Sequence, residues 1–219
     1  MLLYLTKNDK EFPKGLNITD FTPQEFNTGK ADVFCMDTSL LTFIQWLRTF
    51  LGVQIVINSG YRSVAYNKKI GGVEGSRHCY GQAIDFTLNS EGRKQYNIMK
   101  VASLIDESLF YRNHGWGMEI DIHPKDGQNG WGYIHIDCRK DKWRAVRFSG
   151  SSFTTCNSLF GVIDISNKAS VYTWQYVLNT VNNAGLVIDG LYGAKTRKAI
   201  DDITLANTVP RLIFYGLML

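Results

Sequence analysis

Apolar residues first recur at helical spacing in the segment 37–52. Asp37 and Thr38 supply an N-cap, and Gly52 follows the last apolar position, where we expect it to end the helix. Residues 53–57 are a short β-branched run, which predicts a strand that leads into a loop at 59–63. The expected apolar face of the helix consists of Leu40, Phe43, Ile44, Leu47 and Phe50.

Two more segments carry a clear pattern. Residues 83–87 are predicted to form a strand that carries Asp85. Residues 93–109 predict a single amphipathic helix, because apolar side chains recur along one of its faces. These side chains are Ile98, Val101, Ala102, Ile105 and Leu109.

An antiparallel hairpin is predicted between residues 115 and 137. Residues 118–123 and 133–137 alternate with period two, and each run follows a Gly-Trp-Gly triplet. Residues 124–130 between them are rich in turn formers, as a hairpin connection requires.

The second strand of this hairpin gathers polar side chains on one face. Because side chains alternate along a strand, Tyr133, His135 and Asp137 point to the same side. If residue 123 pairs with residue 131, Glu119 lies opposite His135 on that face.

The periodic signal weakens after residue 139. Residues 140–168 fit a linker or trailing elements of a first domain. A helical face then appears at Val171, Trp174, Leu178 and Val181, with Gly185 after it and a second helix expected at 196–203. We therefore expect an α+β chain with a first domain at 1–150, a linker at 151–168 and a small all-α domain at 169–219.

Composition places the 219-residue chain among soluble globular proteins, with 44% hydrophobic and 20% charged residues. The net charge of +4 and the lack of a dense basic run argue against nucleic acid and suit an anionic wall polymer. The apolar start is too short for a signal peptide, and no run is long enough to insert in a membrane. The scattered cysteines, Cys35, Cys79, Cys138 and Cys156, are expected to be free thiols.

The candidate chemistry lies in three short motifs. Residues 59–63 read Ser-Gly-Tyr-Arg-Ser, residues 76–85 read Ser-x-His-x-x-Gly-x-Ala-x-Asp, and residues 133–137 read Tyr-Ile-His-Ile-Asp. Imidazole nitrogen and carboxylate oxygen bind Zn2+, and three protein ligands leave a fourth position open, as in catalytic sites. The pattern therefore predicts a zinc hydrolase. Its candidate ligands are His78, Asp85 and His135.

Further residues have alternative roles. Arg62 is placed either to stabilise an oxyanion or to form a structural salt bridge. The first choice for the general base is Asp137, which could instead orient a ligand histidine, and the second choice is Glu119. Ser76 either binds substrate or caps a turn.

The remaining histidines and two of the cysteines have no predicted role in the chemistry. We expect His114 and His123 on the loop or hairpin surface rather than as metal ligands. Cys79 and Cys138 flank ligands, but on a strand they would point away from the metal, so packing is the expected role.

The three motifs together resemble the zinc D-Ala-D-Ala carboxypeptidase family, which includes VanY- and VanX-like enzymes, phage L-Ala-D-Glu endopeptidases and the Hedgehog fold. The similarity covers about residues 16–139, with a lead-in at 17–26 and the pattern His-x-Asp-x-Arg at 135–139. It implies a Hedgehog/DD-peptidase-like antiparallel sheet with helices. By this resemblance His78, Asp85 and His135 bind zinc, and Arg62 assists both the substrate and the transition state. Ser76 and Tyr133 are further candidates for contact with the substrate.

One position departs from this family. Many members place an acidic base three residues before the last ligand histidine, where this chain has Gly132. The departure favours an alternative, a non-catalytic wall-binding or virion protein that keeps zinc for stability. A second alternative is a peptidase of soluble D-Ala-D-Ala ends.

The C-terminal unit resembles small peptidoglycan-binding helical domains. The similarity lies in residues 174–179 and 187–199, and Arg211 and Tyr215 fit the tail of one subgroup. A lytic domain joined to such a unit resembles a bacteriophage endolysin. The resemblance implies a monomer made in the host cytoplasm without a signal peptide. It would act on bacterial peptidoglycan after holin-dependent release or from the virion.

Overall fold

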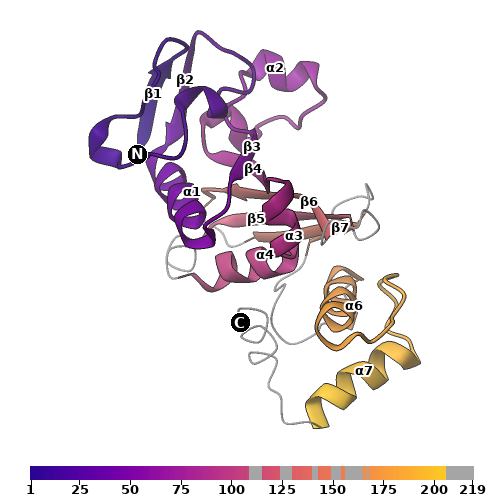
Figure 1. Cartoon of the computed structure of the whole chain (residues 1–219). Helices are drawn as coiled ribbons and strands as arrows, with labels where there is room; N and C mark the ends of the chain where they lie inside the picture. The colour runs from indigo at the N-terminus through magenta and orange to yellow at the C-terminus, as the bar shows by residue number, and fades with distance from the viewer. Residues whose placement is uncertain are drawn as a thin grey trace.

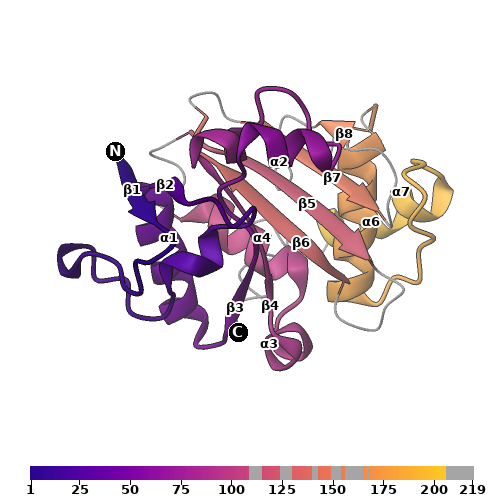
Figure 2. The same cartoon turned by 90° about the horizontal axis from the view of Figure 1, so that it is seen from above.

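A six-stranded sheet forms the centre of the first 155 residues, as Figures 1 and 2 show. The computed structural model describes residues 1–108, 115–123, 130–139, 143–148, 154–155, 165–166 and 168–205. Within these, the strands lie in the order β3-β4-β6-β5-β7-β8, antiparallel except for the parallel pair β5 and β7. Their bounds are β3 Ile55–Ser59, β4 Ala83–Leu88, β5 Gly117–His123, β6 Gly130–Asp137, β7 Trp143–Phe148 and β8 Thr154–Thr155. A smaller antiparallel sheet pairs β1 Leu2–Thr6 with β2 Val33–Asp37.

Helices pack on one face and one end of the large sheet. Figure 2 looks onto the sheet, with α4 behind the strands and α1 to their left. The helices of this region are α1 Thr38–Leu51, α2 Val64–Lys69, α3 Ser90–Gln95 and α4 Ile98–Glu107, with short 3-10 turns η1 Lys14–Leu16, η2 Pro23–Phe26 and η3 Arg77–Tyr80. Two helices follow near the C-terminus, α6 Lys168–Asn182 and α7 Ala194–Leu205.

Strand alternation divides the sheet into an apolar and a polar face. Every second residue of the central strands is buried in the main hydrophobic core that includes the inner sides of α1 and α4. These residues are Ile84, Phe86, Met118, Ile120, Ile134 and Ile136. The intervening positions are polar, so the opposite face is the one that carries the candidate site.

The predicted first helix is confirmed. The Asp37 side chain accepts a hydrogen bond from the Ser39 amide, and Gly52 ends the helix with a positive φ of 65°. Phe50 was wrongly placed on the apolar face, since it is 55% exposed and stacks on Trp46. Leu51 is buried instead.

The single helix predicted at 93–109 is wrong. The chain forms two helices, because Tyr96 takes an extended conformation and the Asn97 side chain caps a new helix by accepting a bond from the Met99 amide. Asparagine competes well for an N-cap, and this local preference overrides the continuous apolar pattern. Leu109 lies outside the described residues.

The hairpin is confirmed as antiparallel, with Glu119 in register with His135. The assumed pairing of residue 123 with residue 131 is wrong, since His123 pairs with Gly130. A bulge between Asp121 and Ile122 accounts for the difference.

Residues 143–148 and 154–155 add two strands to the sheet, which agrees with the alternative that this region holds trailing elements of the first domain. Strand β7 lies parallel to β5, and β8 pairs with β7. Parallel strands are joined by a long crossover connection and not by a tight turn, so the sequence carries no hairpin motif that would predict the pairing of β7 with β5.

Helix α6 packs partly on the sheet region. Tyr176 of α6 is buried in the main core, and its hydroxyl accepts a hydrogen bond of 2.6 Å from the Asn97 amide. Trp174, Leu178 and Leu186 form a separate small cluster. The proposed domain boundaries stay predictions. None of the helices in the described residues is long and apolar enough to cross a membrane.

Candidate metal centre

Strands β4, β6 and β5 align three acidic and imidazole side chains in one row. Asp85 on β4 is in register with His135 on β6, and Glu119 on β5 is in register with His135 from the other side. Residues in register on neighbouring strands place their side chains within contact distance on the same face. The sheet therefore fixes this row by its hydrogen-bond register.

His78 reaches the row from the turn η3. Gly81 ends η3 with a positive φ of 66°, and a Cβ there would lie 2.2 Å from the Cys35 carbonyl oxygen. Only glycine fits that conformation and that space without displacement. The chain can therefore turn from η3 directly into β4, which brings His78 back over Asp85.

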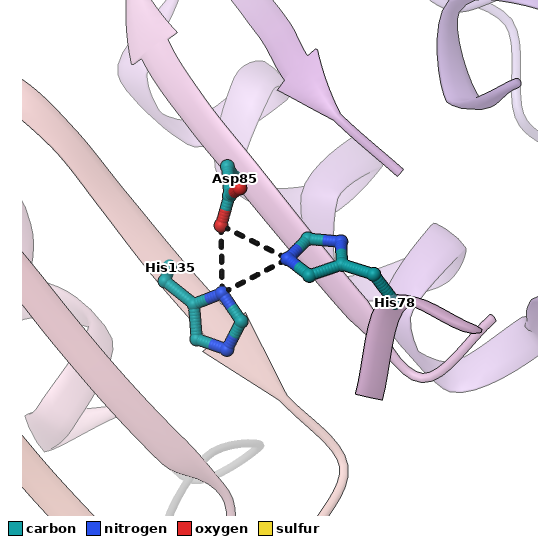
Figure 3. A group of neighbouring side chains, drawn as sticks. All are labelled: His78, Asp85 and His135. Atoms are coloured by element: carbon teal, nitrogen blue, oxygen red, sulfur yellow. Dashed lines mark hydrogen bonds and ion pairs between the residues drawn. The ribbon is translucent and has the colours of Figure 1, made fainter. Parts of the chain in front are cut away.

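The three side chains converge on one point (Figure 3). His135 Nδ1 lies 2.6 Å from Asp85 Oδ1 and 3.3 Å from His78 Nε2, and His78 Nε2 lies 3.2 Å from the same Asp85 oxygen. All candidate ligand atoms lie within 4.8 Å of one another. Both histidines are buried.

The donor set fits zinc. Two imidazole nitrogens and one carboxylate oxygen are ligands that zinc prefers, and their number leaves a fourth position open. His78 Nδ1 donates a hydrogen bond of 2.7 Å to the Gly60 carbonyl oxygen, so Nε2 keeps its lone pair for a metal. Such a second contact commonly fixes the tautomer of a metal-binding histidine.

Asp137 lies behind His135 rather than in front of the candidate ligands. Its Oδ2 is 3.2 Å from His135 Nε2, the ring nitrogen that points away from Asp85. Asp137 is 0% exposed, and the Arg139 guanidinium binds both of its oxygens. This position supports the orienting role and not the role of general base.

The pKa values of His135, Asp85 and Asp137 are shifted by the contacts among these side chains. Burial lowers the pKa of His135, but hydrogen bonds from its ring to Asp137 and Asp85 outweigh this and raise the pKa to about 10. Burial opposes ionisation of Asp85 and Asp137, yet contacts with the histidines and, for Asp137, with Arg139 hold both pKa values well below the ordinary range. Without metal, the ligands thus form a charged, hydrogen-bonded cluster.

Arg62 pairs with a candidate ligand. Its Nη2 donates to Asp85 Oδ2 at 2.7 Å, and its Nε donates to Ser59 Oγ at 2.7 Å. The salt bridge expected as one alternative is therefore present. Gly60 makes this corner possible, since a Cβ there would lie 2.4 Å from the Phe26 carbonyl oxygen. A contact between Arg62 and a substrate stays a prediction.

Two of the other predicted site residues, Tyr133 and Glu119, lie on the same face of the sheet as His135. Ser76 precedes η3, and its side chain does not cap that turn. Burial and neighbouring carboxylates raise the pKa of Tyr133 to about 12. Glu119 is half-buried, and burial raises its pKa above the ordinary value, with nearby carboxylates adding to the rise and His135 opposing it.

The remaining histidines and cysteines lie apart from the ligand cluster where they are described. His123 is half-buried and contacts Asp121 Oδ2 through Nε2 at 3.2 Å. Cys35, Cys79 and Cys138 are free thiols, and burial raises the pKa of Cys138 to about 12. His114 and Cys156 lie outside the described residues.

Two residues near this face, Asp121 and Arg147, had no predicted role, and they pair with each other. Arg139 belongs to the His-x-Asp-x-Arg pattern, and the structure gives it a role, because it anchors Asp137. The signal for Asp121 was its alternation with Glu119 on a strand whose other side chains are apolar. Arg147 had no such signal, because its strand was not predicted.

Comparison with known proteins points to one family. A family model described as Peptidase M15 matches residues 19–118, a range that holds His78 and Asp85 but ends before His135. A zinc D-Ala-D-Ala carboxypeptidase from Streptomyces albus G is 42% identical over 50 residues, which are 22% of this chain and 20% of that relative. The chain thus spans about a fifth of the length of this curated relative.

Residues 19–118 are thus similar to the Peptidase M15 family, and a 50-residue part of the chain is similar to a zinc D-Ala-D-Ala carboxypeptidase. The mixed α and β architecture is compatible with this similarity. Together with the convergent His78, Asp85 and His135, the matches imply zinc as the cofactor.

Proposed function

We propose that this chain is a zinc-dependent peptidase that hydrolyses amide bonds in the stem peptides or cross-links of bacterial peptidoglycan. The convergence of His78, Asp85 and His135 on an open polar face carries the proposal. The wall substrate is supported by the name of the Streptomyces relative, a zinc D-Ala-D-Ala carboxypeptidase.

His78, Asp85 and His135 would hold the zinc ion. When bound, zinc supplies a Lewis acid that activates water and polarises the scissile carbonyl. The protein's own groups do the positioning. Asp137 keeps a proton on His135 Nε2, so that Nδ1 faces the ligand cluster, and Arg62 orients Asp85 through its outer oxygen.

Glu119 is the general base of this proposal. Its side chain stands on the open face beside His135, whereas Asp137 is enclosed behind the ring. A carboxylate there can accept the proton of the attacking water and deliver it to the leaving amine nitrogen. The raised pKa of Glu119 suits a group that must both take up and release a proton.

Position 132 has no room for an acid in this fold. A Cβ on Gly132 would lie 2.6 Å from the Asp121 carbonyl oxygen and 2.9 Å from His123 Cδ2. Both contacts arise at the bulge of β5, where Asp121 and Ile122 lie opposite this part of β6. Glu119 therefore supplies, from the neighbouring strand, the carboxylate that Gly132 lacks.

The C-terminal helices would bind the wall and keep the enzyme close to it. Gln175 of the proposed binding motif is 1% exposed and bonds Asp189, Thr196 and the backbone of the loop between the helices. It therefore shapes the unit rather than contacting a sugar. We propose that the protein acts as an endolysin or virion-associated lytic protein.

A non-catalytic zinc protein of the wall is the second candidate, favoured by Gly132. Defined soluble muropeptides separate the two, with products identified by mass spectrometry. The proposal expects loss of a terminal D-alanine or internal cleavage of the peptide, absent in Glu119→Gln. Intact muropeptides together with binding to sacculi would instead establish the second candidate.

A further inference from the structure

A second row of polar residues lies beside the row that holds His135. Asp121 on β5 is in register with Tyr133 on β6 and with Arg147 on the parallel strand β7. Tyr133 and His135 are two residues apart on one strand, so the two rows share the polar face. The second row is therefore the immediate neighbour of the candidate metal centre.

Arg147 connects the members of this row. Its Nη2 lies 2.9 Å from Asp121 Oδ2 and 3.5 Å from the Tyr133 hydroxyl oxygen, and its guanidinium lies 5.5 Å from the centre of the Tyr133 ring. His123 Nε2 adds a contact of 3.2 Å to the same Asp121 oxygen. Asp121 is 4% exposed, so this anchor is fixed inside the protein.

Stability alone is a weak explanation for the Asp121–Arg147 pair. Desolvation offsets much of the attraction within a buried ion pair, and well-packed apolar residues often replace such a pair at no cost. The Asp121–Arg147 pair instead holds Tyr133, a half-buried side chain on the polar face of the sheet. A cation against both the ring and the hydroxyl oxygen restricts the rotation of that side chain.

We propose that Asp121 and Arg147 position Tyr133, so that its hydroxyl donates a hydrogen bond to the substrate oxygen that becomes negative during hydrolysis. Two residues along a strand span about 7 Å. A phenol anchored at that distance from His135 can reach an oxygen bound at the open side of the cluster. Donors placed at a developing oxyanion act more strongly in the transition state than in the ground state.

This inference rests on the proposed peptidase function, and Tyr133→Phe, Arg147→Lys and the double variant test it. Zinc content, melting temperature, kcat and KM are measured on a defined muropeptide. Lys94→Ala, which breaks the exposed ion pair with Glu91, is the matched surface control. The expected result is that Tyr133→Phe and Arg147→Lys each lower kcat about tenfold or more, with zinc retained and KM little changed. The double variant is expected to lose little beyond the larger single loss.

A readout without turnover separates this inference from the proposed function. With 3-fluorotyrosine incorporated, the fluorine resonance that Tyr133→Phe removes belongs to Tyr133. We expect Arg147→Lys to shift or broaden that resonance in the metal-free protein, and Lys94→Ala to leave it unchanged.

An unaltered Tyr133 resonance in Arg147→Lys overturns the inference. Independent, multiplicative losses in the double variant, or a rise in KM alone, overturn it as well. An inactive wild-type protein defeats the proposed function instead, while the resonance still reports on the positioning.

Discussion

Asp137 approaches His135 through Nε2, while Nδ1 of the same ring faces Asp85 and His78. A carboxylate on the far side of a ligand imidazole sets its tautomer and raises its basicity. The Arg139 guanidinium and complete burial hold Asp137 there. Its contribution is therefore expected in metal affinity rather than in proton transfer.

Replacing Asp137 with asparagine should weaken zinc binding by about 10–100-fold, as losses of comparable outer contacts do. Titration of the metal-free protein against a competing chelator measures this. Activity should largely return at saturating zinc. Asp202→Asn, at an exposed ion pair on α7, is the control and should bind zinc normally. Full zinc occupancy with a lost rate would make Asp137 the base instead.

Glu119→Gln should show the opposite pattern. The amide keeps the size of the side chain but cannot accept the proton, so turnover should fall by about two to four orders of magnitude. Zinc content should stay at the wild-type level, because Glu119 is outside the converging ligand set. A variant that keeps its rate would remove Glu119 from the mechanism.

His78→Ala should abolish stoichiometric zinc binding and lower stability. Metal that binds only the folded state stabilises that state, and this linkage disappears with the ligand. Melting curves with and without added zinc test the effect. The wild-type transition should rise on zinc addition, whereas that of His78→Ala should not move. An equal rise in both proteins would place the metal elsewhere.

Zinc binding near pH 7 should release about one proton, because a ligand nitrogen must be deprotonated. His135 has a pKa raised to about 10 in the metal-free protein, against about 6.5 in an unfolded chain. Protonated His135 stabilises the metal-free fold. This stabilisation is complete below the pKa of the unfolded chain, about 6.5, and is lost as the pH rises through the folded-state pKa of about 10. Zinc affinity should therefore increase as the pH rises between these two pKa values. Calorimetry in buffers of different ionisation enthalpy measures the release, and a value near zero would contradict the assignment.

Tyr176→Phe should destabilise the whole chain. The hydroxyl of this buried residue accepts a bond from the buried Asn97 amide. Leaving that donor unsatisfied costs about 1–3 kcal/mol. Denaturant unfolding compares it with Tyr4→Phe, a control at a side chain that is 70% exposed. Unchanged stability would show that α6 is not coupled to the sheet region.

The candidate zinc ligands and the pairing of Glu119 with His135 could be proposed from the sequence because local rules govern both. Glycine at position 81 permits the turn, and strand alternation puts Glu119 and His135 on one face. Contacts set by tertiary structure were not readable in the same way. Asp137 shares its face with His135 whether it acts as base or as orienting group, and only the enclosure by Arg139 distinguishes these roles.

Long-range pairing explains the other differences. Strand β7 pairs in parallel with β5, and no turn motif in the sequence predicts a parallel pairing. The sequence therefore offered no reason to assign a role to Arg147. The helix break at Asn97 was missed because apolar periodicity continues across it, while the capping side chain decides the local conformation.

Release of free amino groups from isolated bacterial sacculi is the most direct test of a zinc peptidase built on His78, Asp85 and His135. The purified protein should release amino groups, lose that activity after treatment with a chelator, and regain it when zinc is returned. The His78→Ala protein should stay inactive under all three conditions. Release that persists without metal, or that His78→Ala performs at the wild-type rate, would contradict this account.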